Sequence, residues 1–191
     1  MARSPFIAVL DANVLFPLTL RDTLLRAAAA GFYQLRWSAD ILDEMERNLV
    51  STRTVLADRA ARLRATMETY FPEAEVLGSR PRISTLQNHP KDRHVVVAAL
   101  EAGARVIVTS NLKDFVPLPD GLDAQSPDNF LLDLFESDPA AFAELLREQA
   151  GDLVKPPVTF DELLARLDKI VPEFVSAVRA ETARSGEATV G

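Results

Sequence analysis

A short apolar run that ends at an acidic residue constrains the fold of this chain most strongly: Phe6 to Leu10, followed by Asp11. A continuous apolar run with β-branched members predicts a strand buried on both faces, which is typical of parallel sheets. Arg105 to Thr109 has the same character. Helical patterns separate these two runs, and the alternation of strands and helices predicts an α/β domain built on a parallel sheet.

The segments around the two main strands carry helix signals of their own. Thr19 and Asp22 have the spacing of a capping box, and Ser38 is suited to cap the helix that follows. Gly103 is suited to end the helix before the second main strand. We expect helices over about residues 19–30, 38–50, 54–70 and 92–102, with shorter strands at about 33–37, 75–77 and 122–124.

The chain from residue 127 onward has a helical pattern. Two capping patterns, Asp138-Pro139 and Thr159 to Glu162, mark the starts of helices. We therefore expect an α/β body in residues 1–130 and a helical extension in residues 131–191. Three roles for that extension stay open, namely packing on the body, formation of a homodimer and binding of a partner segment.

The composition excludes several kinds of site. The chain has no cysteine and only two histidines, His89 and His94, which excludes disulfides, thiolate zinc sites, iron–sulfur clusters, a cysteine nucleophile and a histidine-rich metal site. Any metal is therefore expected to be held by oxygen ligands. No apolar stretch approaches the ~18 residues of a transmembrane helix, and the first apolar run is too short for a signal-peptide core, so we expect a soluble, cytoplasmic protein.

The net charge of −7 argues against a protein that binds nucleic acid regardless of sequence, because such proteins need a basic surface. The charge is unevenly distributed: residues 1–113 contain 15 basic and 12 acidic residues, whereas residues 114–191 contain 6 basic and 16 acidic ones. The first part is therefore expected to contact any anionic ligand. A helix that carries Arg59, Arg62 and Arg64 suits an RNA-binding track, an acidic partner or simple solvation.

Acidic residues recur where strands end and helices begin. Asp11 ends the first main strand, Glu44 lies near the start of the second helix, and Asp92 stands at the start of the fourth. Asn111 and Asp114 follow the second main strand. Parallel strands end at one edge of their sheet, where sites form in open α/β folds, so we expect these residues to converge.

Carboxylates that share a pocket raise one another's pKa, and a divalent cation relieves the repulsion between them. Mg²⁺ and Mn²⁺ prefer oxygen ligands, and such a cation lowers the pKa of water and neutralises charge on a phosphate. The pattern therefore favours a Mg²⁺ or Mn²⁺ site suited to phosphodiester hydrolysis. Simpler interpretations stay open: Asp92 could only cap its helix, and Glu44 is ambiguous beside Asp43 and Glu46, which we expect to be solvated.

Four segments resemble, in order, the motifs of the PIN-domain ribonucleases, and especially of the VapC-like toxins of type II toxin–antitoxin pairs. They are Val9–Leu15, Ile41–Met45, Lys91–Ala99 and Val108–Phe115. The resemblance covers about residues 6–130. It implies a three-layer α/β/α PIN-like fold with a parallel sheet plus a C-terminal helical extension. It also implies a Mg²⁺- or Mn²⁺-dependent endoribonuclease that hydrolyses RNA phosphodiester bonds and is held inactive by a cognate antitoxin protein.

The same resemblance implies a set of four catalytic positions. Asp11 and Asp92 are the principal metal ligands, and Glu44 is the second acidic position. The fourth acid of many family members lies in a Thr-x-Asp motif, where this chain has Asn111. Either Asp114, three residues on, supplies the missing carboxylate or Asn111 contributes a neutral oxygen, which leaves one metal or two as alternatives.

Other residues near these positions are candidates for supporting roles. We expect Asn13 to fix the loop after the first strand and Thr109 to orient a carboxylate, with an ordinary turn residue and an ordinary strand residue as the alternatives. Lys91, Arg93 and Lys113 flank the expected site and suit contacts to RNA phosphates, with solvated surface charge as the alternative.

Two alternative functions remain open on the sequence alone. One is a PIN-type nuclease outside any toxin system, which processes rRNA or cuts DNA flaps, although no segment suited to grip DNA is evident. The other is a catalytically silent domain that binds RNA or protein, which Asn111 in place of an acid keeps open. A silent domain would not require Asp11 for its effect. His94 is interpreted as a histidine satisfied at a helix start rather than as a general base.

Overall fold

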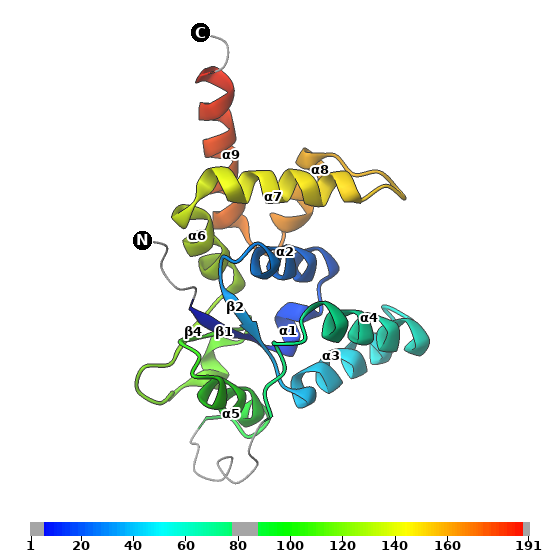
Figure 1. The fold of residues 1–191 in the computed structure, drawn as a ribbon, viewed down its shortest axis with the longest axis vertical. Coiled ribbons are helices and arrows are strands. Elements are labelled where there is room, and N and C mark those ends of the chain that lie inside the picture. The colour runs from blue at the N-terminus through cyan, green and yellow to red at the C-terminus, as the bar shows by residue number, and fades with distance from the viewer. Residues whose placement is uncertain (1–5, 78–87, 189–191) are drawn as a thin grey trace. The chain divides into compact units, whose positions relative to one another are not determined.

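The computed structural model describes residues 6–77 and 88–188, and its centre is a four-stranded sheet (Figure 1). The strands are β1 (Ile7–Leu10), β2 (Gln34–Arg36), β3 (Val106–Val108) and β4 (Asp123–Gln125). They lie in the order β2-β1-β3-β4, and every neighbouring pair is parallel. The predicted α/β class with a parallel sheet is therefore confirmed, and helices flank this sheet.

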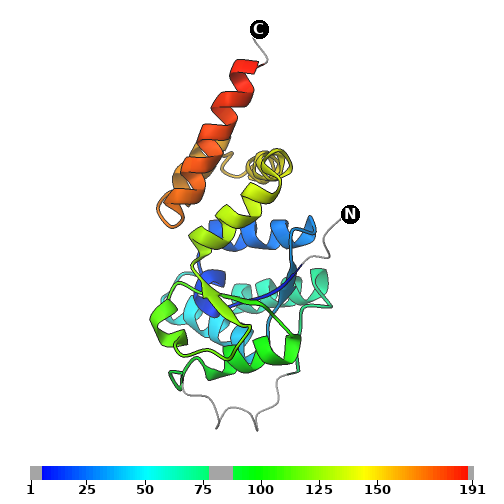
Figure 2. The ribbon, with the colours of Figure 1, turned by 90° about the vertical axis from the view of Figure 1, so that its left-hand side faces the viewer.

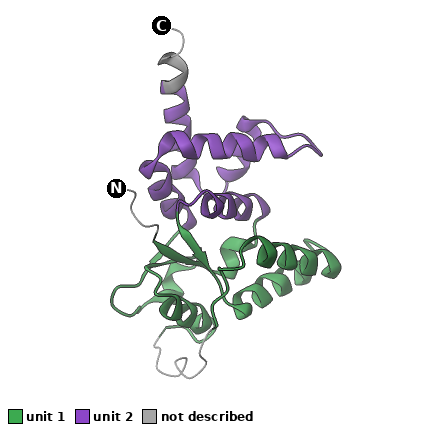
Figure 3. Ribbon diagram, in the orientation of Figure 1, with its two compact units in different colours: residues 1–17, 33–126 green, residues 18–32, 127–191 purple. Residues whose placement is uncertain are grey.

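The chain divides into two compact units (Figure 3). Unit 1 comprises residues 1–17 and 33–126 and contains the sheet, whereas unit 2 comprises residues 18–32 and 127–191 and is helical. The domain division expected from the sequence, with its boundary at residue 130, stays a prediction, because compact units and domains need not coincide.

The helices of unit 1 are α1 (Ala12–Leu15), α3 (Ala39–Ser51), α4 (Ala57–Tyr70) and α5 (Arg93–Ala102), with a short 3₁₀ helix, η2 (Leu112–Phe115). Helix α5 packs against β1, β2 and β3, and all five of its residues from Val95 to Ala99 are buried. Helix α3 contacts α1, α4 and α5. Ser38 caps α3 as predicted, since its side chain accepts a hydrogen bond from the Ile41 amide.

Unit 2 contains α2 (Leu18–Ala29), α6 (Pro127–Ser137), α7 (Pro139–Asp152), α8 (Phe160–Leu167) and α9 (Pro172–Ala188), the long red helix of Figure 2. Edge-to-face contacts join four buried or half-buried aromatic side chains at its centre: Phe32, Phe135, Phe142 and Phe174. Such contacts stabilise a core beyond the burial of apolar area. The capping box of Thr159 and Glu162 is confirmed, and so is the cap that Asp138 provides for α7.

The start of α2 differs from the sequence-based expectation. The helix begins at Leu18, so Thr19 lies inside its first turn and does not cap it. Pro17 directly precedes the helix, and its ring holds φ near the helical value, which lets the turn begin earlier. The Thr19 carbonyl instead accepts hydrogen bonds from Thr23 Oγ1 at 3.0 Å and Gln149 Nε2 at 3.3 Å, and so links α2 to α7.

Two further elements of unit 1 also differ from expectation. Helix α4 begins at Ala57 rather than near residue 54, after a turn in which Arg53 has a φ of 55°. The strand expected at residues 75–77 is reduced to one parallel bridge between Trp37 and Glu75. A three-residue apolar pattern is too short to determine strand pairing, which depends on how far the neighbouring strand continues.

The end of α5 gives a test of this backbone geometry. Gly103 has a φ of 63°, and a Cβ added there would meet no atom within 4 Å. Gly103→Ala should therefore lower the free energy of unfolding by about 1–2 kcal/mol through backbone strain alone. Gly151→Ala, in α7 and with equal space, is the matched control and should be neutral or stabilising by up to about 1 kcal/mol. Urea denaturation measures the free energy of unfolding of both variants. Equal effects of the two substitutions would contradict the left-handed backbone conformation of Gly103.

Candidate active site

The candidate site lies where β1 and β3 end. Leu10 and Val108 are register partners on these neighbouring strands, so the residues that follow them, Asp11 and Thr109, come side by side. The Asp11 amide donates to the Val108 carbonyl at 3.1 Å, which fixes this arrangement. The strand order also reverses direction between β1 and β3, and ligands of open parallel sheets bind at such switch points.

Polar neighbours hold the Asp11 carboxylate in place. Its Oδ2 atom accepts hydrogen bonds from Asn13 Nδ2 at 2.6 Å and from Thr109 Oγ1 at 2.8 Å. Asn13 is itself fixed, because its Oδ1 atom accepts a hydrogen bond from the Ser110 amide at 3.0 Å. The structure thus brings two of the supporting candidates, Asn13 and Thr109, into contact with Asp11.

Asp11 is only 3% exposed, and its burial has an electrostatic consequence. Burial raises the pKa of Asp11 from its ordinary value of 3.8 to about 6, although the hydrogen bond from Thr109 acts in the opposite direction. The nearby carboxylates of Glu44 and Asp92 raise this pKa further. Three of the predicted acidic positions therefore share one electrostatic environment, and Asp11 resists ionisation within it.

Asp92 stands at the N-terminus of α5, but its carboxylate makes no hydrogen bond that caps the helix. The simpler interpretation of Asp92 as a helix cap therefore has no support from the geometry. Its Oδ2 atom lies 3.4 Å from Nδ1 of His89. Burial raises the pKa of Asp92, and the Asp114 carboxylate raises it further, while His89 and His94 lower it.

Asn111 and Asp114, the two alternatives for the fourth acidic position, form a hydrogen-bonded pair. Asn111 Nδ2 donates a hydrogen bond to Asp114 Oδ2, and the Asn111 amide donates to Thr109 Oγ1 at 3.1 Å. The His89 amide donates to the Asp114 carbonyl at 3.3 Å, which ties the segment before α5 to η2. The negative charge of Asp114 acts on Asp92, and both alternatives for the fourth position lie together beside it.

Glu44 reaches the same region from α3. Its side chain is 35% exposed, and its Oε2 atom lies 3.4 Å from Nε2 of His94. The two acids beside it behave as expected for residues outside the site, since both Asp43 and Glu46 form ion pairs with Arg64 of α4. Among the three neighbouring acids of α3, Glu44 is therefore the one that joins the carboxylate group.

The basic side chains predicted to contact RNA differ in their exposure and contacts. Lys91 and Lys113 are exposed, whereas Arg93 is half-buried and its Nε donates to the Asn88 carbonyl at 3.1 Å. On α4, Arg62 forms an exposed ion pair with Asp58 of the same helix, whereas Arg64 pairs with acids of α3 and so links the two helices.

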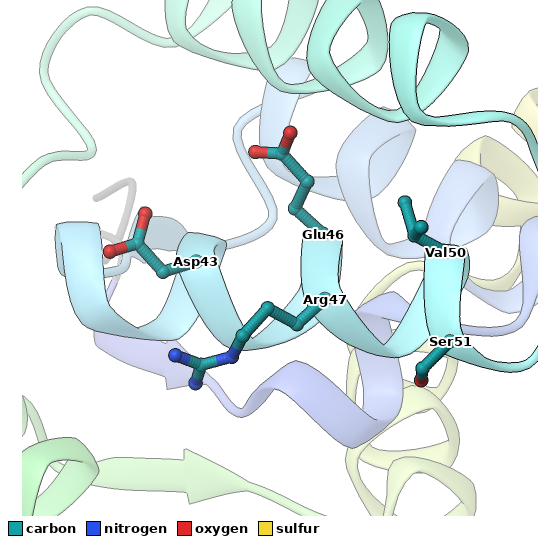
Figure 4. A pocket seen from close by; sticks show the side chains of 5 residues that line it. All are labelled: Asp43, Glu46, Arg47, Val50 and Ser51. Carbon is teal, nitrogen blue, oxygen red and sulfur yellow. The ribbon is translucent and has the colours of Figure 1, made fainter.

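One basic residue was missed from the sequence. Arg47 lines two adjoining surface hollows along α3, of which one is shown in Figure 4 with Val50 and Ser51. The other hollow, of about 450 Å³, contains Glu44, His94 and Lys91 as well. Arg47 has no ion-pair partner among the residues that the structure describes. Arg47 follows Glu44 by three residues on α3, a spacing that places both side chains on one face of the helix, so the helical pattern is the signal that could have indicated it.

The carboxylates do not form a ready-made cage. Within residues 6–77 and 88–188, no three acidic or histidine side chains lie close enough together to hold a metal ion by themselves. This arrangement fits Mg²⁺, which usually keeps several waters and is bound through only one or two carboxylates. The candidate side chains at this site offer carboxylate and amide oxygens, which are the ligands that Mg²⁺ prefers.

Comparison with known proteins agrees with this geometry. Residues 8–113 match the family model described as PIN domain, and this match spans more than half of the chain. The chain belongs to the PIN domain family. The four sequence motifs that indicated this family therefore identified it correctly. Three of the four catalytic candidates, Asp11, Glu44 and Asp92, lie within the matched residues, and Asp114 directly follows them.

A second family model, described as VapC50 C-terminal domain, matches residues 127–180, which lie in unit 2. The chain is also 37% identical over 109 residues to a protein of Mycobacterium tuberculosis (strain ATCC 25618 / H37Rv) described as "Putative ribonuclease VapC50". That alignment covers 56% of this chain and 64% of its relative. No solved structure matches this PIN-domain chain significantly. None of the helices that the structure describes combines the length and apolar character needed to cross a membrane.

The buried Asp11 predicts a pH-dependent stability. A carboxylate whose pKa is raised on folding destabilises the folded state as the pH rises above its unfolded-state pKa, and this loss of stability is complete above the raised pKa. Asp11→Asn should therefore raise the free energy of unfolding of the metal-free protein by about 2–3 kcal/mol at about pH 8, and by little at about pH 4. Urea unfolding in EDTA measures this.

Glu73→Gln, at an exposed acid of unit 1 outside the site, is the control and should show no such pH dependence. Destabilisation by Asp11→Asn at the higher pH, or an equal effect at both pH values, would contradict the electrostatic account.

Proposed function

We propose that this chain is a Mg²⁺- or Mn²⁺-dependent endoribonuclease that hydrolyses RNA phosphodiester bonds. One observation carries the proposal: Asp11 is buried at the switch point of the sheet, and the charges of Glu44 and Asp92 add to the rise of its pKa. Such an arrangement costs stability and is expected where a cation binds. The name of the mycobacterial relative supports ribonuclease as the class of activity.

The residues present fit a divalent cation. Asp11 and Asp92 would hold it, and Glu44 and Asp114 would complete the acidic set. Bound there, the cation would lower the pKa of water and neutralise charge that develops on the scissile phosphate. Of this acidic set, Asp11 is the member most strongly held in place by hydrogen bonds, so it provides a fixed reference point for the site.

Other side chains of the protein would orient the acidic residues and position the RNA. Asn13 and Thr109 orient the Asp11 carboxylate, and Asn111 orients Asp114. Basic side chains near the site would position the RNA substrate through its phosphates. We assign phosphate contacts to the predicted residues Lys91, Arg93 and Lys113, and we add Arg47 because it lines the hollow that contains Glu44.

We further propose that the protein is the toxin of a toxin–antitoxin pair. Two findings support this proposal: the VapC50 C-terminal domain match in unit 2 and the VapC50 name of the relative. The partner is then an antitoxin protein that blocks the site until it is removed, and the substrate is a cellular RNA in the cytoplasm.

Activity should depend on the two principal carboxylates. Asp11→Asn and Asp92→Asn should each reduce cleavage of purified RNA by at least about 100-fold, because each removes a negative charge that the cation requires. Cleavage by the unaltered protein should need Mg²⁺ or Mn²⁺ and stop in EDTA. A gel-based assay on purified total RNA with each protein measures both effects.

Glu73→Gln serves as the matched control, since it removes an exposed carboxylate outside the site, and it should cleave RNA at the rate of the unaltered protein. Cleavage that persists in EDTA or in Asp11→Asn would show that a contaminating nuclease or another site is responsible. An absence of cleavage under all conditions would favour the silent binding domain.

The toxin proposal has a separate readout in cells. Induced expression of the unaltered protein should arrest growth and produce discrete RNA fragments, whereas Asp11→Asn at equal expression should do neither. Co-expression of the small reading frame adjacent to the gene should restore growth. Growth without arrest, together with cleavage of RNA in vitro, would instead support a housekeeping nuclease of the same family.

A further inference from the structure

Asn111 makes two hydrogen bonds that join different parts of the candidate site. Its main-chain amide donates to Thr109 Oγ1 at 3.1 Å, and its side-chain Nδ2 donates to Asp114 Oδ2. Thr109 Oγ1 in turn donates to Asp11 Oδ2 at 2.8 Å. A chain of three hydrogen bonds therefore runs from Asp114, on η2, through Asn111 and Thr109 to the buried Asp11.

The hydroxyl group of Thr109 is fully used in this chain. Its oxygen accepts hydrogen bonds from Asn13 Nδ2 at 3.0 Å and from the Asn111 amide, which fills both acceptor positions of a hydroxyl. The hydroxyl proton is therefore directed at Asp11 Oδ2. The backbone of Asn111 thus helps to fix the direction in which Thr109 donates to Asp11.

The side chain of Asn111 has an equally definite orientation. An ionised carboxylate only accepts hydrogen bonds, so the atom that faces Asp114 Oδ2 must be the amide nitrogen. Asn111 also stands at the N-cap of η2, where an asparagine side chain commonly accepts a hydrogen bond from a backbone amide, but it makes no such bond here. The side-chain amide therefore serves Asp114 rather than the end of η2.

The other end of the chain of hydrogen bonds lies near Asp92. The Asp114 carbonyl accepts a hydrogen bond from the His89 amide at 3.3 Å, and the His89 carbonyl accepts one from the Asp92 amide at 3.0 Å. The charge of Asp114 also raises the pKa of Asp92. Asp114, and not the neutral Asn111, therefore brings negative charge to Asp92.

We propose that Asn111 is a positioning residue whose amide holds Asp114 as the fourth acid and ties it to Asp11 through Thr109, so that the site requires a neutral donor at position 111. The inference rests on the proposed function, because it gives Asp114 a part in binding the divalent cation. A carboxylate at position 111 could not donate to Asp114 and would place two like charges in contact.

The substitution Asn111→Asp is the sharpest test, because it adds an acid to the site while it removes the donor. We expect it to weaken the binding of Mn²⁺ to the full chain by about 10–100-fold, as measured by calorimetry, which is the usual effect of losing a group that orients a metal-binding side chain. If Asn111 itself offered its oxygen to the cation, the same substitution would strengthen binding through the added charge. The two alternatives for the fourth acidic position therefore predict opposite signs.

The substitution Asp114→Asn gives a second background for the same measurement. Alone, it should also weaken Mn²⁺ binding by about 10–100-fold. Added to it, Asn111→Asp should now strengthen binding, because the repulsion is gone and the new amide can donate to the new carboxylate. Such a reversal of sign requires direct contact between the two side chains. A substitution that only disturbed the fold of η2 would weaken binding in both backgrounds.

Gln34→Glu is the control, because it adds the same negative charge at the start of β2, at the end of the sheet away from the site. The Oε1 acceptor that Gln34 offers to Arg36 is kept. Since salt screens charges at that separation, Mn²⁺ affinity should stay within about twofold of that of the unaltered protein. Thermal melting of every variant establishes that each is folded.

Several outcomes would overturn the inference: Asn111→Asp that leaves Mn²⁺ affinity unchanged or strengthens it, a sign that does not reverse beside Asp114→Asn, or no Mn²⁺ binding by the unaltered protein. The proposed function fails separately. If the Mn²⁺ affinities follow the expected pattern but the unaltered protein cleaves no purified RNA, Asn111 still positions Asp114 and the nuclease proposal is wrong.

Discussion

The site depends on one buried carboxylate, that of Asp11 between the ends of β1 and β3. Removing an aspartate from water disfavours its charged form, and the neighbouring carboxylates oppose that charge as well. Asn13 and Thr109 donate hydrogen bonds to Asp11 but cannot compensate fully, since its pKa stays well above the ordinary value. A proton relieves the remaining cost below a pH of about 6, and a bound cation, as proposed above, would relieve it at higher pH.

The rest of unit 1 provides a rigid support for this unfavourable arrangement. The parallel register of β1 and β3 fixes Asp11 beside Thr109, and the buried helix α5 brings Asp92 to the same edge. Side chains on rigid elements keep their positions when like charges repel, whereas side chains on loops move apart. The acidic site thus reduces the stability of the metal-free protein, in keeping with the general conflict between stability and function at such sites.

Much of this arrangement follows from local patterns. The apolar run before Asp11 predicted a buried strand, and parallel strands end at one edge, so the convergence of Asp11, Asp92 and the residues after β3 could be predicted. Asn13 and Thr109 could be chosen as supporting candidates because they lie next to these strand ends, and in the structure both contact Asp11. The family was identifiable for the same reason, since its motifs lie at those ends.

Features that depend on contacts between distant helices could not be predicted. The approach of His94 to Glu44 requires the packing of α3 on α5, which no local pattern determines. The hydrogen bond between Asn111 and Asp114 likewise depends on how the chain turns into η2. Residues 18–32 join unit 2 because of long-range contacts such as that between Thr23 and Gln149, which are far apart in the sequence.

The most direct test of the account is a carbon-13 NMR titration of the aspartate carboxyl groups, with and without Mg²⁺, in which Asp11→Asn assigns the Asp11 signal. The account predicts that Asp11 titrates with a pKa of about 6 in the metal-free protein and that saturating Mg²⁺ moves this pKa below its ordinary value of 3.8. An Asp11 that titrates near 3.8 and does not respond to Mg²⁺ would contradict both the electrostatic origin of the site and its assignment as a cation-binding centre.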